Sequence, residues 1–214
     1  MSRTALVAGP TGLVGRLLVK RLLANSVYTR VTVLTRRPLP IVNLKLISLQ
    51  TDFGDLGKLG AQLNADDVFC CLGTTLRKAG SRAAFERVDY HMVVDLARAT
   101  KAAGARQFLV ISAVGASTRS PAFYSRVKAR MEQAVADVGF AAVHILRPSL
   151  LLGARDEQRV AEDLAQRLAP LLLPLFIGPL KKYRPVRAEE VAIAMETLAL
   201  RPSKGVQIHH LPLE

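Results

Sequence analysis

The chain has 214 residues, of which 50% are hydrophobic and 22% are charged, as in an ordinary globular protein. This length favours one domain, residues 1–214, with a sizeable core, and the composition excludes a disordered chain. The formal net charge is +13, and the 30 Lys and Arg residues are spread along the chain, which suits a solvated surface that attracts an anionic ligand.

In chain order, the hydrophobic pattern predicts strands that alternate with helices. We expect a strand at 4–8, a helix at 12–25, strands at 30–35 and 44–49, a short helical stretch, a strand at 67–71, a helix at 83–103, a strand at 107–111, a helix at 123–138, a strand at 142–146, helices at 157–168 and 188–200, and a strand at 206–210. Such alternation predicts an α/β fold: one Rossmann-type, doubly wound, mainly parallel sheet flanked by helices.

A glycine-rich turn joins the first predicted strand to the first predicted helix. Residues 9–15 read Gly-Pro-Thr-Gly-Leu-Val-Gly, a spacing typical of a dinucleotide-binding turn in this position. Glycine lets the backbone approach a pyrophosphate, and the free N–H groups of the helix N-terminus can bind its oxygens, whereas Pro10 has no N–H to donate. The alternative is a tight connection without a ligand. The predicted cofactor-binding residues of this turn are Gly9, Thr11, Gly12, Leu13, Val14 and Gly15.

The end of the second predicted strand favours NADP(H) over NAD(H). An NAD-binding protein usually places an acid there for the ribose hydroxyls, but this chain has Arg36 and Arg37. Two guanidinium groups suit a 2′-phosphate through charge and bidentate hydrogen bonds, although they could also be a solvated pair. Asp52, after the third strand, is a candidate acceptor for the adenine amino group.

Three residues form a candidate catalytic set. Tyr124 and Lys128 are four apart on a predicted helix, so their side chains share one face. The ammonium is expected to lower the pKa of the tyrosine, which could then act as general acid toward a carbonyl oxygen. Ser112 ends a predicted strand, where ligands bind in such sheets, and its hydroxyl could polarise the same oxygen.

Together these motifs resemble the short-chain dehydrogenase/reductases in their atypical or extended form. Residues 70–75 (CCLGTT), 78–80 (KAG), 85–89 (FERVD), 146–149 (LRPS) and 184–186 (RPV) narrow the resemblance to the Tat-interacting oxidoreductase-like proteins and their bacterial relatives. The resemblance covers nearly the whole chain, with departures at Pro10, where alanine is common, and at Ser149, where many members have glycine.

The resemblance implies further roles for residues of this chain. It places residues 72–74 beside the cofactor and residues 147–149 next to the nicotinamide. It also assigns residues 150–185 to a small C-terminal portion that covers the substrate as a lid. Some members of the family are better described as regulators that bind other proteins. The residues implied beside the cofactor, in addition to Tyr124 and Lys128, are Leu72, Gly73, Thr74, Arg147, Pro148 and Ser149.

Three hypotheses for function remain. The first is a reductase that transfers hydride from NADPH to a small apolar carbonyl substrate. The second is a cofactor-binding regulator with little turnover that binds a protein partner or a second copy of itself. The third is a nucleic-acid binder, although the chain has no zinc finger, basic helix or aromatic platform to support it.

Other features of the sequence concern the cysteines, metal binding and cellular location. Cys70 and Cys71 are adjacent and badly placed to bridge each other, and Cys71 could be a thiol nucleophile or simply a small buried residue. The four histidines show no metal-ligand spacing, so no metal site is predicted. A secretory signal is not evident, and the apolar stretch 168–180 is too short to span a bilayer, so we expect a cytoplasmic protein without a membrane partner.

Overall fold

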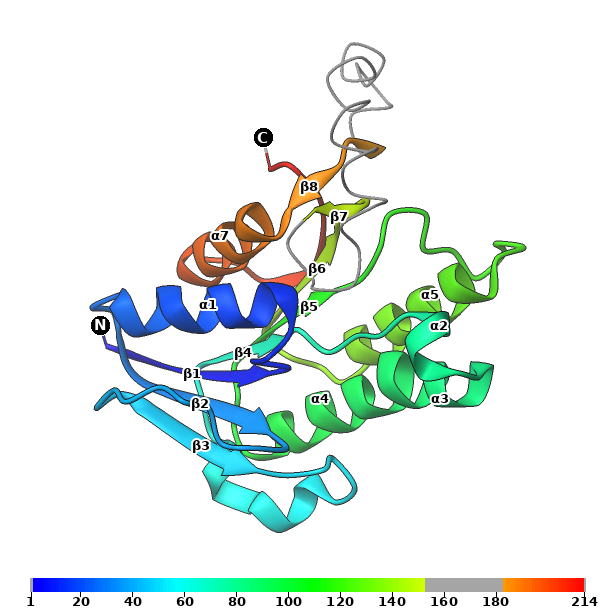
Figure 1. The fold of residues 1–214 in the computed structure, drawn as a ribbon. Coiled ribbons are helices and arrows are strands. Elements are labelled where there is room, and N and C mark those ends of the chain that lie inside the picture. The colour runs from blue at the N-terminus through cyan, green and yellow to red at the C-terminus, as the bar shows by residue number, and fades with distance from the viewer. Residues whose placement is uncertain (1, 153–182, 214) are drawn as a thin grey trace.

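The computed structural model describes residues 2–152 and 183–213 (Figure 1). Its main sheet has seven strands in the order β3-β2-β1-β4-β5-β6-β9, and every neighbouring pair is parallel. This confirms the predicted Rossmann-type sheet. The strands are β1 (Arg3–Ala8), β2 (Tyr28–Thr35), β3 (Leu46–Gln50), β4 (Asp67–Cys70), β5 (Gln107–Ile111), β6 (Ala142–Arg147) and β9 (Gly205–His210).

Helices cover both faces of the sheet. On one face α1 (Leu13–Ala24) packs beside α7 (Ala188–Leu200), and on the other lie α4 (Met92–Ala102), α5 (Phe123–Ala136) and the 3₁₀ segment η1 (Leu56–Leu63) (Figure 1). The central strands are buried on both faces, which explains their nearly continuous apolar sequence. The two faces build two hydrophobic clusters, one around Leu18 and Met195 and the other around Leu96 and Met131.

The segment predicted as one helix at 83–103 is more irregular than expected. It consists of α3 (Arg82–Glu86), a π-helical turn η2 (Arg87–His91) and α4, and a short helix α2 (Leu76–Ala79) precedes it. A π-turn inserts an extra residue into a helix and is frequent at functional sites. The hydrophobic pattern does not show this turn, because Phe85 and Val93, the apolar residues on either side of it, are at a spacing that a regular helix also allows.

Two short strands complete the described elements. β7 (Leu151–Leu152) pairs in parallel with β8 (Val186–Arg187), which holds the two sides of the region 153–182 next to each other. The predicted helix at 157–168 and most of the predicted lid at 150–185 lie outside the described residues. None of the helices in residues 2–152 and 183–213 is both long and apolar enough to cross a membrane.

Candidate active site

A pocket of about 320 Å³ lies where the sheet changes direction, between the start of α1 and the carboxyl ends of β4, β5 and β6. In this sheet the strand order reverses between β1 and β4. Ligands of doubly wound sheets bind at such a point, because the connections on its two sides run to opposite faces and leave a crevice at the carboxyl ends of the strands. The pocket brings together ten of the predicted site residues: Gly12, Leu13, Val14, Leu72, Gly73, Thr74, Ser112, Tyr124, Lys128 and Ser149.

The glycine turn is as tight as its sequence predicts. Gly9 has a φ of +78°, and a Cβ there would lie 2.7 Å from the carbonyl oxygen of Cys71. A Cβ on Gly15 would lie 2.1 Å from the Gly9 carbonyl oxygen, so the first turn of α1 can sit against the loop only without side chains. The N-cap residue, Gly12, has no side-chain cap, and the first turn carries no acid. This helix N-terminus therefore fits a dinucleotide pyrophosphate.

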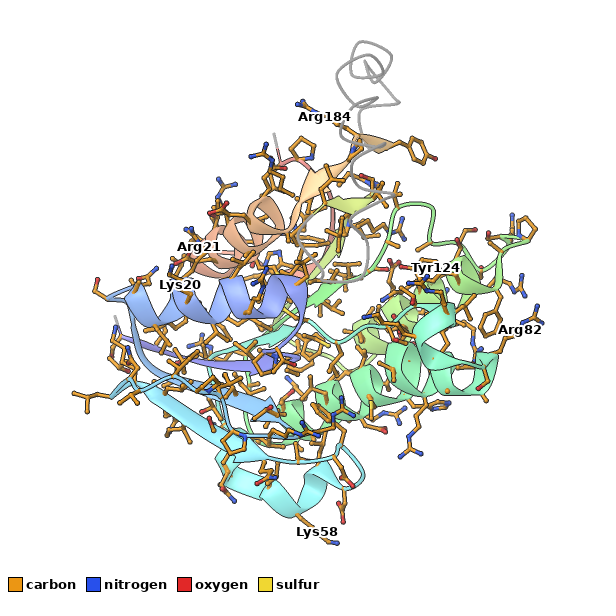
Figure 2. The ribbon with its side chains drawn as sticks, in the orientation of Figure 1. Lys20, Arg21, Lys58, Arg82, Tyr124 and Arg184 are labelled. Atoms are coloured by element: carbon orange, nitrogen blue, oxygen red, sulfur yellow. The ribbon has the colours of Figure 1, made fainter. Side chains whose placement is uncertain are left out.

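The candidate catalytic residues meet in the same pocket. Tyr124 projects from the first turn of α5 (Figure 2) and packs against Phe85, with ring centroids 5.5 Å apart. The Lys128 side chain is buried, and its Nζ lies 3.3 Å from the Ile111 carbonyl oxygen. The Ser112 hydroxyl is buried and has no hydrogen-bond partner among the described residues. A buried polar group without a partner in a pocket is suited to a ligand.

Asp89 is a site residue that the sequence analysis left without a role. It lies on the π-turn, is 1% exposed, lines the pocket and forms an ion pair with Lys128 at 2.8 Å. Its other carboxylate oxygen accepts the Thr74 N–H at 2.8 Å, which ties the loop after β4 to the catalytic lysine. The signal was present: Asp89 interrupts an apolar stripe that runs through Phe85 and Val93, and a buried acid requires a partner.

Burial and charge set the pKa values in the pocket. Burial raises the pKa of Tyr124, Asp89 raises it further, and Lys128 lowers it only in part. The net direction of the Tyr124 pKa is opposite to the predicted lowering, because burial outweighs the charge of Lys128 and Asp89 adds to the rise. Burial alone would lower the pKa of Lys128, but Asp89 and Tyr124 raise it above its ordinary value, so the ammonium stays charged.

The predicted adenosine-side residues lie outside the pocket, at the carboxyl ends of β2 and β3. Arg36 and Arg37 are exposed, and their backbone is held by the Gln50 side chain and by Thr35 Oγ1. Asp52 is exposed, and its Oδ1 accepts the Gly54 N–H at 2.8 Å.

The segment after β6 has its own internal partners. Both ends of the Arg147 guanidinium contact the Glu132 carboxylate, at 2.9 and 2.5 Å, so this side chain is held on α5. The Pro148 carbonyl accepts the Val114 N–H, and the Ser149 hydroxyl donates to the Arg184 carbonyl. Of these three predicted residues, only Ser149 lines the pocket.

The cysteines do not provide an activated thiol. Burial raises the pKa of Cys70 to about 12 and also raises that of Cys71, so both stay protonated at neutral pH. Cys71 Sγ lies 3.9 Å from Met195 Sδ, in the manner of a small core residue. Within the described part of the chain, no group of three or more His, Cys, Asp or Glu side chains is placed to hold a metal ion.

Comparison with known proteins agrees with this geometry. Residues 9–161 match a family described as NAD(P)H-binding. The chain is 34% identical to protein HTATIP2 of Rattus norvegicus over 174 residues, which cover 78% of this chain and 70% of that protein. It is 34% identical to the mitochondrial protein fmp52 of Emericella nidulans (80% and 76% covered) and 32% identical to mitochondrial FMP52 of Coccidioides immitis (97% and 89%).

Solved structures with the same fold include enzymes with bound NAD. MoeE5 in complex with UDP-glucuronic acid and NAD superposes with a TM-score of 0.73 at 18% identity, covering 96% of this chain and 75% of that one. The Bordetella bronchiseptica enzyme WbmG in complex with NAD gives a TM-score of 0.71 at 15% identity, covering 98% and 73%. At these identities the likeness concerns the fold.

The cytoplasmic location expected from the sequence is contradicted by the relatives. Several of them carry a mitochondrial location in their names. The expectation was based on the lack of an evident secretory signal and on an apolar stretch too short to span a bilayer, and neither distinguishes the cytoplasm from an organelle. The family match, the relatives and the glycine cradle together show that this chain belongs to the NAD(P)H-binding family of Rossmann-fold proteins.

Proposed function

We propose that this protein is an NADP(H)-dependent oxidoreductase that reduces a carbonyl group of a small, apolar substrate. The observation that carries the proposal is the buried Ser112 hydroxyl, which lacks a partner among the described residues and lines one pocket with Tyr124 and Lys128. Two hydroxyl groups beside a buried ammonium suit an oxygen that gains negative charge during reduction. When bound, the dinucleotide supplies the hydride.

Each side chain in the pocket has a separate task in this proposal. Ser112 donates a hydrogen bond to the substrate oxygen, and Tyr124 gives that oxygen its proton. The raised pKa of Tyr124 keeps the phenol protonated at neutral pH, as reduction requires. Lys128 stabilises the phenolate that remains, and Asp89 keeps the ammonium charged and in place.

Preference for NADP(H) follows from Arg36 and Arg37. Their side chains are exposed beside the end of β2, and among the described residues neither has an ion-pair partner, so both guanidinium groups are free to bind a 2′-phosphate. Calorimetric titration with NADP⁺ and separately with NAD⁺ tests this proposal. Binding of NADP⁺ that is clearly tighter than that of NAD⁺ is expected, and equal affinities would contradict the assignment.

The chemistry is tested by following NADPH oxidation with a panel of aldehydes and ketones, and then with Tyr124→Phe. Loss of the phenolic proton should lower turnover about 10²–10⁴-fold. NADP⁺ affinity, measured by calorimetry, serves as the control and should change little. A Tyr124→Phe variant that reduces a genuine substrate at the wild-type rate would refute the role of Tyr124.

The second hypothesis, a cofactor-binding regulator with little turnover, is favoured by one observation. Asp89 joins Lys128 to the Thr74 loop, so a ligand at the lysine can change the order of residues 72–75. Affinity purification with and without NADPH tests this idea. Partners that bind equally in both conditions would count against it.

A further inference from the structure

The connection from β2 to β3 leaves out a helix that the fold normally has. The chain steps from β1 to β2 and from β2 to β3 in the same direction across the sheet. Crossovers between parallel strands are right-handed, so both connections lie on one face, where α1 forms the first of them. The second, residues 36–45, contains no helix, although such crossovers usually do.

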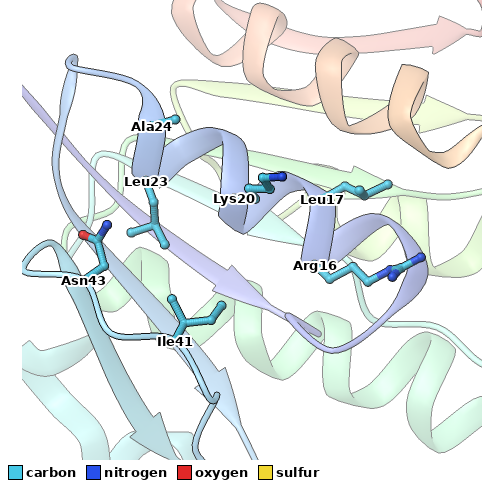
Figure 3. Close-up of a pocket in the computed structure, with 7 residues that line it drawn as sticks. All are labelled: Arg16, Leu17, Lys20, Leu23, Ala24, Ile41 and Asn43. Carbon is cyan, nitrogen blue, oxygen red and sulfur yellow. The ribbon is translucent and has the colours of Figure 1, made fainter.

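An apolar groove occupies the place beside α1 that this helix would cover. Its volume is about 610 Å³, and Leu17, Leu23 and Ile41 line it together with Arg16 and Lys20. Figure 3 shows Leu23 on α1 and Ile41 on the loop directed toward one another across it. Ile41 is 43% exposed, and Val42 and Leu44 on the same loop are fully exposed, which is unusual for three aliphatic side chains so close together.

Two cationic side chains, Arg16 and Lys20, line the groove, and none of the described residues in its lining is acidic. Arg16 and Lys20 are exposed one turn apart on α1, and neither has an ion-pair partner among the described residues. A second pocket adjoins the groove and shares Lys20 with it. On the α7 side that pocket is lined by Glu189 and Glu196, and Glu196 pairs with Arg21 at 2.6 Å.

We propose that this groove binds an acidic amphipathic helix supplied by a partner protein. The missing crossover helix explains the shape, since one more helix beside α1 would complete the layer on this face. The lining favours an apolar stripe at i, i+3, i+4 and i+7, and Arg16 and Lys20 select acidic residues beside that stripe. The concave form favours a helix over a lipid surface, which needs no groove.

The test is fluorescence anisotropy of a labelled amphipathic peptide, with leucines on one face and glutamates flanking them, titrated with the full-length protein. A peptide with lysine in place of each glutamate and a proline-interrupted acidic peptide of the same composition are the peptide controls. The acidic helix alone should bind. Equal binding of the interrupted peptide would overturn the proposal, because it would show charge attraction without recognition of a helix.

Substitutions in the protein test whether the peptide binds in this groove. Lys20→Glu should weaken binding about tenfold or more, and Ile41→Ser should weaken it several-fold. The matched control is Lys58→Glu, which makes the same charge change on η1, on the far side of the sheet (Figure 2), and should stay within about twofold of wild type. Equal losses in Lys20→Glu and Lys58→Glu would overturn the proposal.

Two further measurements test whether the peptide binds in the cofactor site instead and whether the groove binds a lipid surface. Saturating NADP⁺ should leave the peptide affinity unchanged, and displacement of the peptide would mean that it occupies the cofactor site instead. Vesicles that contain phosphatidylserine should not bind in a Lys20-dependent manner. If they do and the peptide does not, the surface is a lipid-binding site and the proposal is wrong.

Discussion

Replacement of Asp89 by Asn tests whether the buried ion pair is a structural necessity of the pocket. Asn keeps the size of the side chain and can still accept the Thr74 N–H, but it leaves the Lys128 ammonium buried without a counter-ion. Removing one partner of such a pair costs about 3–5 kcal/mol. For a chain of this size that loss lowers Tm by roughly 6–20 °C.

The assay is urea and thermal unfolding followed by circular dichroism. The matched control is Glu86→Gln, the same change in the exposed pair with Arg130, which should cost less than about 1 kcal/mol. The double variant Asp89→Asn/Lys128→Met should be more stable than Asp89→Asn alone, because no charge is then left unpaired. If Asp89→Asn lowers the free energy of unfolding no more than Glu86→Gln does, the Asp89–Lys128 pair does not stabilise the pocket and the reasoning is refuted.

Three further predictions concern the cofactor turn, cofactor choice and acid stability. Gly15→Ala places a Cβ 2.1 Å from the Gly9 carbonyl oxygen, so calorimetry should show loss of NADP⁺ binding, whereas a variant that binds normally would show that the turn can relax. Arg36→Ala/Arg37→Ala should weaken NADP⁺ binding about tenfold or more and leave NAD⁺ binding unchanged, and a parallel loss of both would contradict a 2′-phosphate site. Burial lowers the pKa of His144 from 6.5 to about 4, so its contribution to stability is present above pH 6.5 and declines as the pH falls toward 4, by at most about 3 kcal/mol. Urea unfolding at neutral and acidic pH should show a smaller decline in His144→Gln than in wild type, and equal declines would rule out this origin.

The sequence was sufficient to predict the sheet and most of its strands, because the central strands are short apolar runs buried on both faces of the sheet. The glycine turn was predictable for a related reason: Gly9 and Gly15 are required by backbone contacts that any Rossmann turn must make. Ser112, Tyr124 and Lys128 could be grouped because they end a strand and open a helix at the same edge of the sheet.

Other parts of the site depend on contacts that no local pattern contains. The position of Asp89 in an apolar stripe could have marked it as a buried acid, but its partner, a lysine 39 residues further along the chain, is evident only from the structure. The pKa of Tyr124 depends on how far burial outweighs the lysine charge, which cannot be known before packing is known. For Arg147, no local pattern indicates that the Glu132 carboxylate binds its guanidinium.

The pairing of β7 with β8 has a consequence for how this fold can diversify. The Val186 N–H donates to the Leu150 carbonyl oxygen at 2.9 Å, so the two ends of the connection between β7 and β8 lie next to each other. When both ends of a connection are fixed in this way, each doubling of its length costs only about 0.6 kcal/mol in closure entropy. The length of the interval between these two strands can therefore differ among relatives at little cost, while the dinucleotide cradle and the Asp89–Lys128 pair stay the same.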